Sequence, residues 1–140
     1  MEINQAGLDL IKSFEGCKLT AYQDQRGVWT IGYGHTGSDV CAGLTIDEET
    51  AEQLLKEDLH SAESTVSWLV KVPLNPNQFS ALVSLCYNIG SGNFRTSTLL
   101  QCVNESKDPT QEFLKWNHTN GIVNLGLARR RQAEVELYNS

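Results

Sequence analysis

The chain has 140 residues, of which 40% are hydrophobic and 20% charged, and this is enough for one domain that buries a core without disulfides or metals. Its net charge of −6 lacks the basic balance typical of nucleic-acid-binding proteins. No apolar run approaches the roughly 20 residues of a membrane span. The N-terminus shows no secretion signal, and the four cysteines lack the paired spacing of a zinc site. We therefore expect cytoplasmic synthesis, free thiols, no metal, no cofactor and no stable membrane insertion.

The first third of the chain predicts a helix followed by a β-hairpin. The helix is expected over residues 5–15, with Gly16 as its stop signal. Two strands are expected near residues 17–23 and 28–34, joined by the turn sequence "DQRG". Period-two alternation then places Thr30 on the strand face opposite its aromatic neighbours.

The rest of the chain predicts helices separated by capping signals. Thr45 and Glu48 in "TIDE" have the spacing of a capping box, which predicts a long helix that runs to about residue 71. Asn75 and Pro76 predict the start of the next helix, and Gly90 predicts its end. Further helices are expected at 97–104, 108–117 and 127–138, with residues 118–126 as a loop. This order predicts an α+β fold with one small antiparallel sheet.

Glu15 interrupts the apolar face of the first predicted helix. At 100° per residue it falls between Leu8 and Ile11, so its carboxyl is expected to be partly buried. Burial and the negative end of the helix dipole both favour the protonated acid, which is the state that a general acid needs. The alternative is a frayed helix end with Glu15 in water.

Asp58 is a second polar residue inside an apolar helix face, between Leu54 and Leu69 of the long helix. A buried aspartate needs a partner, because an unpaired buried charge is costly. His35 is the candidate partner, and we expect a structural His35–Asp58 pair that ties the hairpin to the long helix. By contrast, the three arginines at 129–131 are expected to form a solvated helix face.

Asp24 lies at the hairpin turn, and Thr30 lies on the strand that follows it. Threonine is a good strand former, which would explain its presence without any chemistry. Together with Glu15, however, these residues provide two carboxyl groups and a hydroxyl. Such a set is suited to activating a water molecule.

The spacing Glu15-x8-Asp24-x5-Thr30 resembles the catalytic signature of the phage-type lysozymes, glycoside hydrolase family 24. The resemblance continues in "TIDEETAEQLLKEDL", "VPLNPNQFSALVSLCYNIGSGNFRTSTLL" and "GLARRRQAEVELY", in the family's order along nearly the whole chain. It implies one two-lobed lysozyme-like domain over residues 1–140. The small lobe would span about 12–50, the connecting helix about 46–71, and the helical lobe about 72–140 plus the N-terminal helix.

The resemblance also implies an activity, that of an endolysin with muramidase activity. Such an enzyme hydrolyses the β-1,4 bond between N-acetylmuramic acid and N-acetylglucosamine in bacterial peptidoglycan. Glu15 would be the general acid. Asp24 would orient or deprotonate the attacking water, or stabilise positive charge, and Thr30 would help hold that water. The family is described as inverting, with carboxyl groups roughly 6.5–9.5 Å apart. A wall-binding module without activity and a lytic transglycosylase are the alternatives.

Further positions carry over from the family by their place in its motifs. The substrate-binding candidates are Thr36, Tyr87, Asn88 and Ser97. For each of them, ordinary turn or helix-end chemistry is the alternative. Arg130 is the candidate partner of Glu15. The expected partners are peptidoglycan glycan strands and no nucleic acid. A monomer is expected, made in the host bacterial cytoplasm and released to the wall with the help of a holin.

Overall fold

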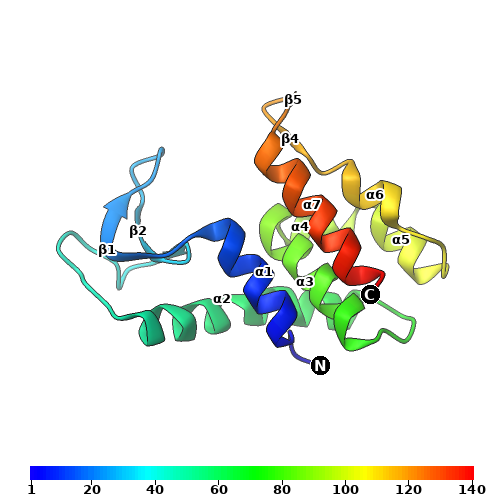
Figure 1. The fold of residues 1–140 in the computed structure, drawn as a ribbon, viewed down its shortest axis with the longest axis horizontal. Helices are drawn as coiled ribbons and strands as arrows, with labels where there is room; N and C mark the ends of the chain where they lie inside the picture. Colours follow the sequence, from blue (N-terminus) through cyan, green and yellow to red (C-terminus); the bar gives the residue numbers. More distant parts are fainter. The chain divides into compact units, whose positions relative to one another are not determined.

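The computed structural model describes residues 1–140 and contains seven helices and five short strands (Figure 1). In chain order these are α1 (Gln5–Glu15), β1 (Lys18–Gln23), β2 (Trp29–Gly32), β3 (His35–Thr36), α2 (Glu48–Leu69), α3 (Pro76–Ile89), α4 (Ser91–Arg95), α5 (Thr98–Asn104), α6 (Thr110–Leu114), β4 (His118–Thr119), β5 (Ile122–Val123) and α7 (Leu125–Tyr138). The predicted α+β class is confirmed. None of the helices combines the length and apolar composition needed to cross a bilayer.

The chain divides into two compact units. The sheet unit is Lys12–His60, and the helical unit combines Met1–Ile11 with Ser61–Ser140. The unit boundaries fall inside α1 and α2, so each of these helices contributes residues to both units.

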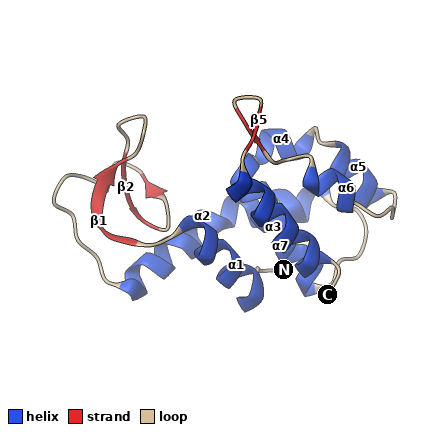
Figure 2. Ribbon diagram, turned by 45° about the horizontal axis from the view of Figure 1, so that its top comes forward, coloured by secondary structure: helices blue, strands red, loops and turns tan.

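The sheet unit contains a three-stranded antiparallel sheet in the order β1-β2-β3, shown in red at one end of Figure 2. Thr30 of the central strand is paired with Tyr22 on one side and with Thr36 on the other. Gly32 ends β2 with a φ of +64°, and a Cβ built there would lie 3.4 Å from the Ala51 side chain. This glycine therefore lets the strand approach α2 closely. The buried apolar side chains of the unit are Ile31, Val40, Ala51, Leu55 and Leu59.

The helical unit has α3 in its core. Eight consecutive residues of α3, 79–86, are buried, which is typical of a helix that is covered on all sides. Its neighbours include α7 and α4. The predicted helix boundaries are confirmed, because Asn75 forms a capping box with Gln78 and the Gly90 N–H donates to the Cys86 carbonyl at the other end.

The predicted capping box at Thr45 is wrong. Helix α2 begins at Glu48, and Asp47 is its cap, with Oδ1 accepting a 2.7 Å hydrogen bond from the Thr50 N–H. Hydrogen bonds from both the side chain and the backbone N–H of Thr50 lower the pKa of Asp47. Thr45 instead forms an antiparallel bridge with Thr20, which keeps its backbone extended. Because the bridge to Thr20 holds Thr45 in an extended conformation, α2 starts after it, at Glu48.

The segment predicted as a loop before the last helix contains the β4–β5 hairpin (Figure 2). Its turn residues Asn120 and Gly121 both have positive φ, 53° and 79°, as a two-residue hairpin turn requires. Asn124 then caps α7 by accepting from the Leu127 N–H, so this helix starts at Leu125 instead of at residue 127. Helix α4 and the two-residue strands were also not predicted, because such short elements carry little periodicity.

Candidate active site

Glu15 is the last residue of α1. The helix ends there because Gly16 adopts a φ of +70°, while its N–H donates to the Lys12 carbonyl at 3.1 Å. The expected burial of Glu15 is wrong: Leu8 and Ile11 are buried, whereas Glu15 is exposed. Its Oε1 lies beside the backbone of Gly34, since a Cβ built at Gly34 would be 3.6 Å from that oxygen. Gly34 itself therefore adds no side chain next to this oxygen.

Asp24 is held by the turn between β1 and β2. Its Oδ1 accepts hydrogen bonds from the backbone N–H groups of Arg26, at 2.8 Å, and Val28, at 3.0 Å. The hydrogen bond from Val28 lowers the pKa of Asp24 below its usual value; slight burial opposes this shift and Arg26 adds to it. Asp24 is therefore ionised at neutral pH. Its second oxygen, Oδ2, has the Arg26 guanidinium 3.7 Å away.

Thr30 is buried, with 4% of its surface exposed, and lies in the central strand of the sheet. Its hydroxyl donates a 3.0 Å hydrogen bond to the Val28 carbonyl, so the hydroxyl oxygen can accept a further bond. Thr36 is directly opposite Thr30 in the β2–β3 ladder. Because residues opposite each other in an antiparallel pair share a face, the two threonines lie side by side.

His35 contacts two carboxylates through its two ring nitrogens. Nδ1 is 2.9 Å from Asp58 Oδ2, so the structure brings the predicted pair together. Nε2 is 3.0 Å from Asp39 Oδ2, a contact that the sequence did not predict. Partial burial of the ring lowers its pKa, but the hydrogen bonds to Asp58 and Asp39 outweigh this, and the pKa of His35 is raised above 6.5. Because ionised carboxylates only accept hydrogen bonds, both ring nitrogens donate when His35 is protonated, and the two contacts therefore favour its charged form.

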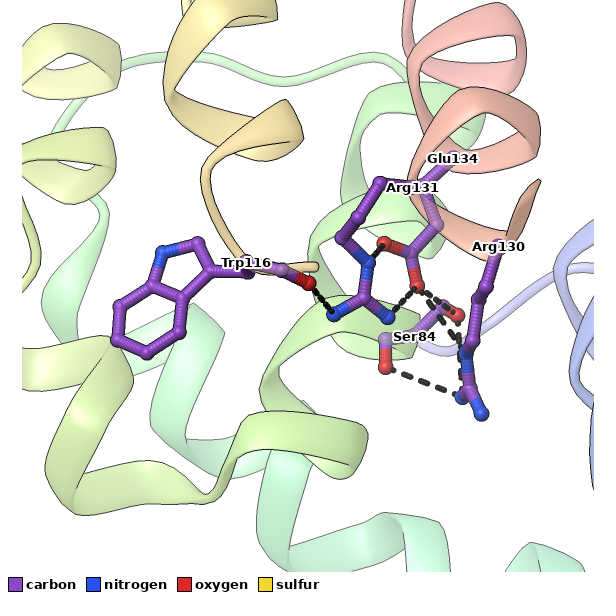
Figure 3. Close-up of polar contacts among 5 residues, drawn as sticks. All are labelled: Ser84, Trp116, Arg130, Arg131 and Glu134. Carbon is purple, nitrogen blue, oxygen red and sulfur yellow. Dashed lines mark hydrogen bonds and ion pairs between the residues drawn. The ribbon is translucent and has the colours of Figure 1, made fainter. Parts of the chain in front are cut away.

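The expectation of a solvated arginine face at 129–131 is wrong for two of the three residues. Arg131 is fully buried, Arg130 is 3% exposed, and only Arg129 is exposed. Figure 3 shows that both buried guanidinium groups point to Glu134, which is itself fully buried. A pairing of Arg130 with Glu15 stays a prediction.

Glu134 is the centre of this buried network in the helical unit (Figure 3). Its Oε1 is 2.7 Å from Arg131 Nε, and its Oε2 accepts hydrogen bonds from Arg131 Nη2 at 3.0 Å and from the Ser84 hydroxyl at 2.6 Å. Complete burial raises the pKa of Glu134, and the two guanidinium groups oppose that rise. Arg131 also donates through Nη1 to the Trp116 carbonyl at 3.3 Å, so the network reaches the segment that precedes β4.

The remaining binding candidates lie in the helical unit. Tyr87, which is half-buried, and the exposed Asn88 occupy the last turn of α3. Ser97 is 6% exposed and caps α5, donating to the Phe94 carbonyl at 2.7 Å and accepting from the Leu100 N–H at 3.1 Å. This geometry favours the capping role of Ser97 over substrate contact.

Asn88 also lines a pocket of about 560 Å³ within the helical unit. Side chains that the sequence did not single out contribute to the same pocket: Ile89, Asn93, Lys115, Trp116 and His118. The signal that could have found them was weak, because these residues come from helix ends, from the short helix α4 and from the hairpin that was predicted as a loop.

Comparison with known protein families identifies the family of this chain. A model of the phage lysozyme family matches residues 12–134, a span that contains Glu15, Asp24 and Thr30. The chain belongs to the phage lysozyme family. The matched span begins with the last turn of α1 and ends within α7, so it takes in all five strands and most of the helices.

Several phage lysozyme relatives are similar over the full length of this chain. The endolysin of Bacillus phage PZA is 45% identical over 144 residues, which cover 100% of this chain and 56% of that protein. The endolysin of Salmonella phage P22 is 43% identical, and the alignment covers 94% of each chain. The muramidase domain of SpmX from Asticaccaulis excentricus superposes with a TM-score of 0.93 at 41% identity, covering 99% of this chain and 98% of that one. The chain spans about half the length of the Bacillus phage endolysins that it matches.

Proposed function

We propose that the chain is an endolysin with muramidase activity that hydrolyses the β-1,4 bonds between N-acetylmuramic acid and N-acetylglucosamine in peptidoglycan. The observation that carries this proposal is the contrast between the two carboxyl groups of the sheet unit. Asp24 is held ionised by backbone N–H groups of its own turn, whereas Glu15 is an exposed acid at the C-terminus of α1 with Gly34 beside its Oε1. Relatives named as endolysins and a muramidase domain support the same assignment.

Glu15 is the general acid of this proposal. Its exposed carboxyl can reach a glycosidic oxygen, and Gly34 places no side chain of its own beside it. Proton donation from Glu15 turns the leaving sugar into a neutral alcohol.

Asp24 orients the attacking water and stabilises positive charge on the sugar. The hydrogen bonds that lower its pKa also make it a weak base, so Asp24 takes the proton of the attacking water only as the new C–O bond forms, when that water becomes strongly acidic. Its Oδ2 is the oxygen that can accept a hydrogen bond from water, because Oδ1 already accepts two backbone N–H groups.

Thr30 provides the second acceptor for that water. Its own proton is directed to the Val28 carbonyl, so the hydroxyl oxygen has a lone pair with which to accept from the water. A water that donates one proton to Thr30 and one to Asp24 has its lone pair directed away from both residues. This lone pair attacks the anomeric carbon from the side opposite the leaving group, which gives inversion.

Thr36, Tyr87 and Asn88 are the proposed substrate-binding residues, and peptidoglycan glycan strands are the proposed partner. Thr36 lies beside Thr30, and Asn88 lines a pocket with Trp116. We further propose that the protein acts as a monomer on the cell wall after holin-dependent release.

The test uses permeabilised Gram-negative cells and purified peptidoglycan. The chain is expected to clear a cell suspension, and Glu15→Gln is expected to leave it turbid. Glu57→Gln is the matched control, since Glu57 is an exposed residue of α2 and should retain full activity. Equal clearing by the chain and by Glu15→Gln would remove Glu15 from the mechanism.

Mass spectrometry of the digested peptidoglycan then identifies the reaction. New reducing ends are expected from hydrolysis. A 1,6-anhydro product would identify a lytic transglycosylase and contradict the role given to Asp24 and Thr30. Binding to peptidoglycan without any product would identify a wall-binding module.

A further inference from the structure

The strand β3 connects two residues that border the candidate catalytic groups. Gly34, immediately before it, lies beside Glu15 Oε1, and Thr36, within it, is paired with Thr30. Yet β3 is only two residues long and is an edge strand that pairs with β2 alone. A strand this short has few backbone hydrogen bonds to fix its position.

The His35 side chain holds this strand at two points. Nδ1 is 2.9 Å from Asp58 on α2, and Nε2 is 3.0 Å from Asp39 in the turn that follows the strand. The imidazole side chain is only 12% exposed, so its charge-assisted hydrogen bonds are partly shielded from water. One side chain therefore connects β3 both to the long helix and to the next turn.

The turn after β3 is built around the Asp39 contact. Gly37 has a φ of +144°, and a Cβ built there would lie 2.8 Å from Asp39 Oδ1. Any side chain at this position would therefore displace the carboxylate that faces His35. The glycine leaves room for Asp39 to lie back toward β3.

We propose that His35 is a positioning residue, which holds β3 between Asp58 and Asp39 so that Gly34 stays beside Glu15 and Thr36 stays opposite Thr30. This inference rests on the proposed function, in which Glu15 and Thr30 act on a glycosidic bond. It assigns His35 no contact with the substrate. It assigns Asp39 a role, as the second anchor of the strand.

The positioning role depends on the protonation of His35. The titratable groups that face the ring are Asp58 and Asp39, and their hydrogen bonds raise its pKa against the opposing effect of burial. When the pH rises through that raised pKa, one ring nitrogen loses its proton and faces a carboxylate without a hydrogen to donate. One of the two anchors is then lost, and β3 becomes less restrained.

The first experiment is an NMR titration of the full chain without substrate. The backbone amide signals of Gly34 and Thr36 are expected to shift with the same midpoint as the His35 imidazole. In Asp39→Asn this shared midpoint is expected at lower pH, because an amide gives the imidazolium no charge. In Glu57→Gln, which removes a carboxylate beside Asp58 that the ring does not contact, the midpoint is expected to be unchanged. Amide signals that do not follow the His35 titration overturn the proposal.

The second experiment measures kcat and KM on purified peptidoglycan. His35→Phe retains a ring but removes both anchors. It is expected to lower kcat about tenfold or more with KM changed less than about twofold, since small displacements of reacting groups act mainly on the chemical step. Asp39→Asn should lower kcat by less. A folded His35→Phe protein with unchanged kcat overturns the proposal, and if the variant does not fold, the NMR titration decides. A chain without muramidase activity contradicts the proposed function instead, and the NMR result still tests the role of His35 in holding β3.

Discussion

Glu134→Ala tests the buried charge network of the helical unit. The substitution removes the carboxylate that accepts hydrogen bonds from the Ser84 hydroxyl, at 2.6 Å, and from Arg131 Nη2, at 3.0 Å. The Arg130 guanidinium also points toward this carboxylate (Figure 3). Because Arg131 and Glu134 are fully buried, water cannot replace the lost partner without opening the unit.

The expected loss follows from the number of groups left without a partner. Removing one member of a buried ion pair costs about 3–5 kcal/mol, because the remaining charge stays buried. The Ser84 hydroxyl loses its acceptor as well, which adds about 1 kcal/mol. The total of about 4–6 kcal/mol is a large part of the 5–15 kcal/mol that typically stabilises a domain. Near the size of this chain it corresponds to a fall in Tm of roughly 10–20 °C.

Urea denaturation followed by far-ultraviolet circular dichroism measures the loss. Arg129→Ala is the matched control, because Arg129 is exposed on the same helix and should change the free energy of unfolding by less than about 0.5 kcal/mol. The double variant Arg131→Met/Glu134→Met should be more stable than Glu134→Ala, since an apolar pair leaves neither of these two charges buried without its partner. A loss below about 1.5 kcal/mol for Glu134→Ala would refute the reasoning, because a buried ion pair should lose at least twice that.

Three further predictions concern other parts of the chain. Gly7→Ala should destabilise the protein by about 1–2 kcal/mol in urea denaturation, because overpacking outweighs the gain in helix propensity where the new Cβ would lie 2.6 Å from that of Ser80. Gly92→Ala is the control, because a Cβ built there meets nothing within 4 Å, and it should cause no loss of stability. An equal loss in both variants would contradict the overpacking explanation. Asp24→Asn should keep the turn, since one side-chain oxygen can still accept both N–H groups, but should lower kcat on peptidoglycan by about 100-fold or more; near-normal turnover would contradict its role. The pKa of His35 is higher in the folded state than its usual value of 6.5, so its stabilising contribution should be complete below about pH 6.5 and lost as the pH rises through the folded-state pKa. The difference in unfolding free energy between the chain and His35→Phe should therefore shrink at alkaline pH. A difference that grows with pH would contradict this prediction.

Local signals in the sequence were enough for the elements whose ends are capped by near neighbours. Helix α3 begins at Pro76 because Asn75 and Gln78 cap each other three residues apart, and it ends at Gly90. Helix α1 ends at Glu15 because Gly16 follows with a positive φ. Interactions of this kind close within one helical turn, so a single sequence contains all that they need.

Distant contacts decided the features that the sequence analysis missed. Thr45 has the spacing of a cap, but its bridge to Thr20 passes that role to Asp47. The approach of Asp39 to the second nitrogen of His35 depends on a tight turn that gave no recognisable pattern.

The sequence by itself determined the class of fold, the family and the candidate chemistry, because a fixed spacing of Glu15, Asp24 and Thr30 is a property of the chain alone. Only the tertiary structure decided the environment of each charge. Glu15, predicted to be partly buried, is exposed, and Arg131, predicted to be solvated, is buried against Glu134. The physical reason is that burial depends on what packs against a residue, and here Ser84 meets Glu134 across 50 positions of the sequence.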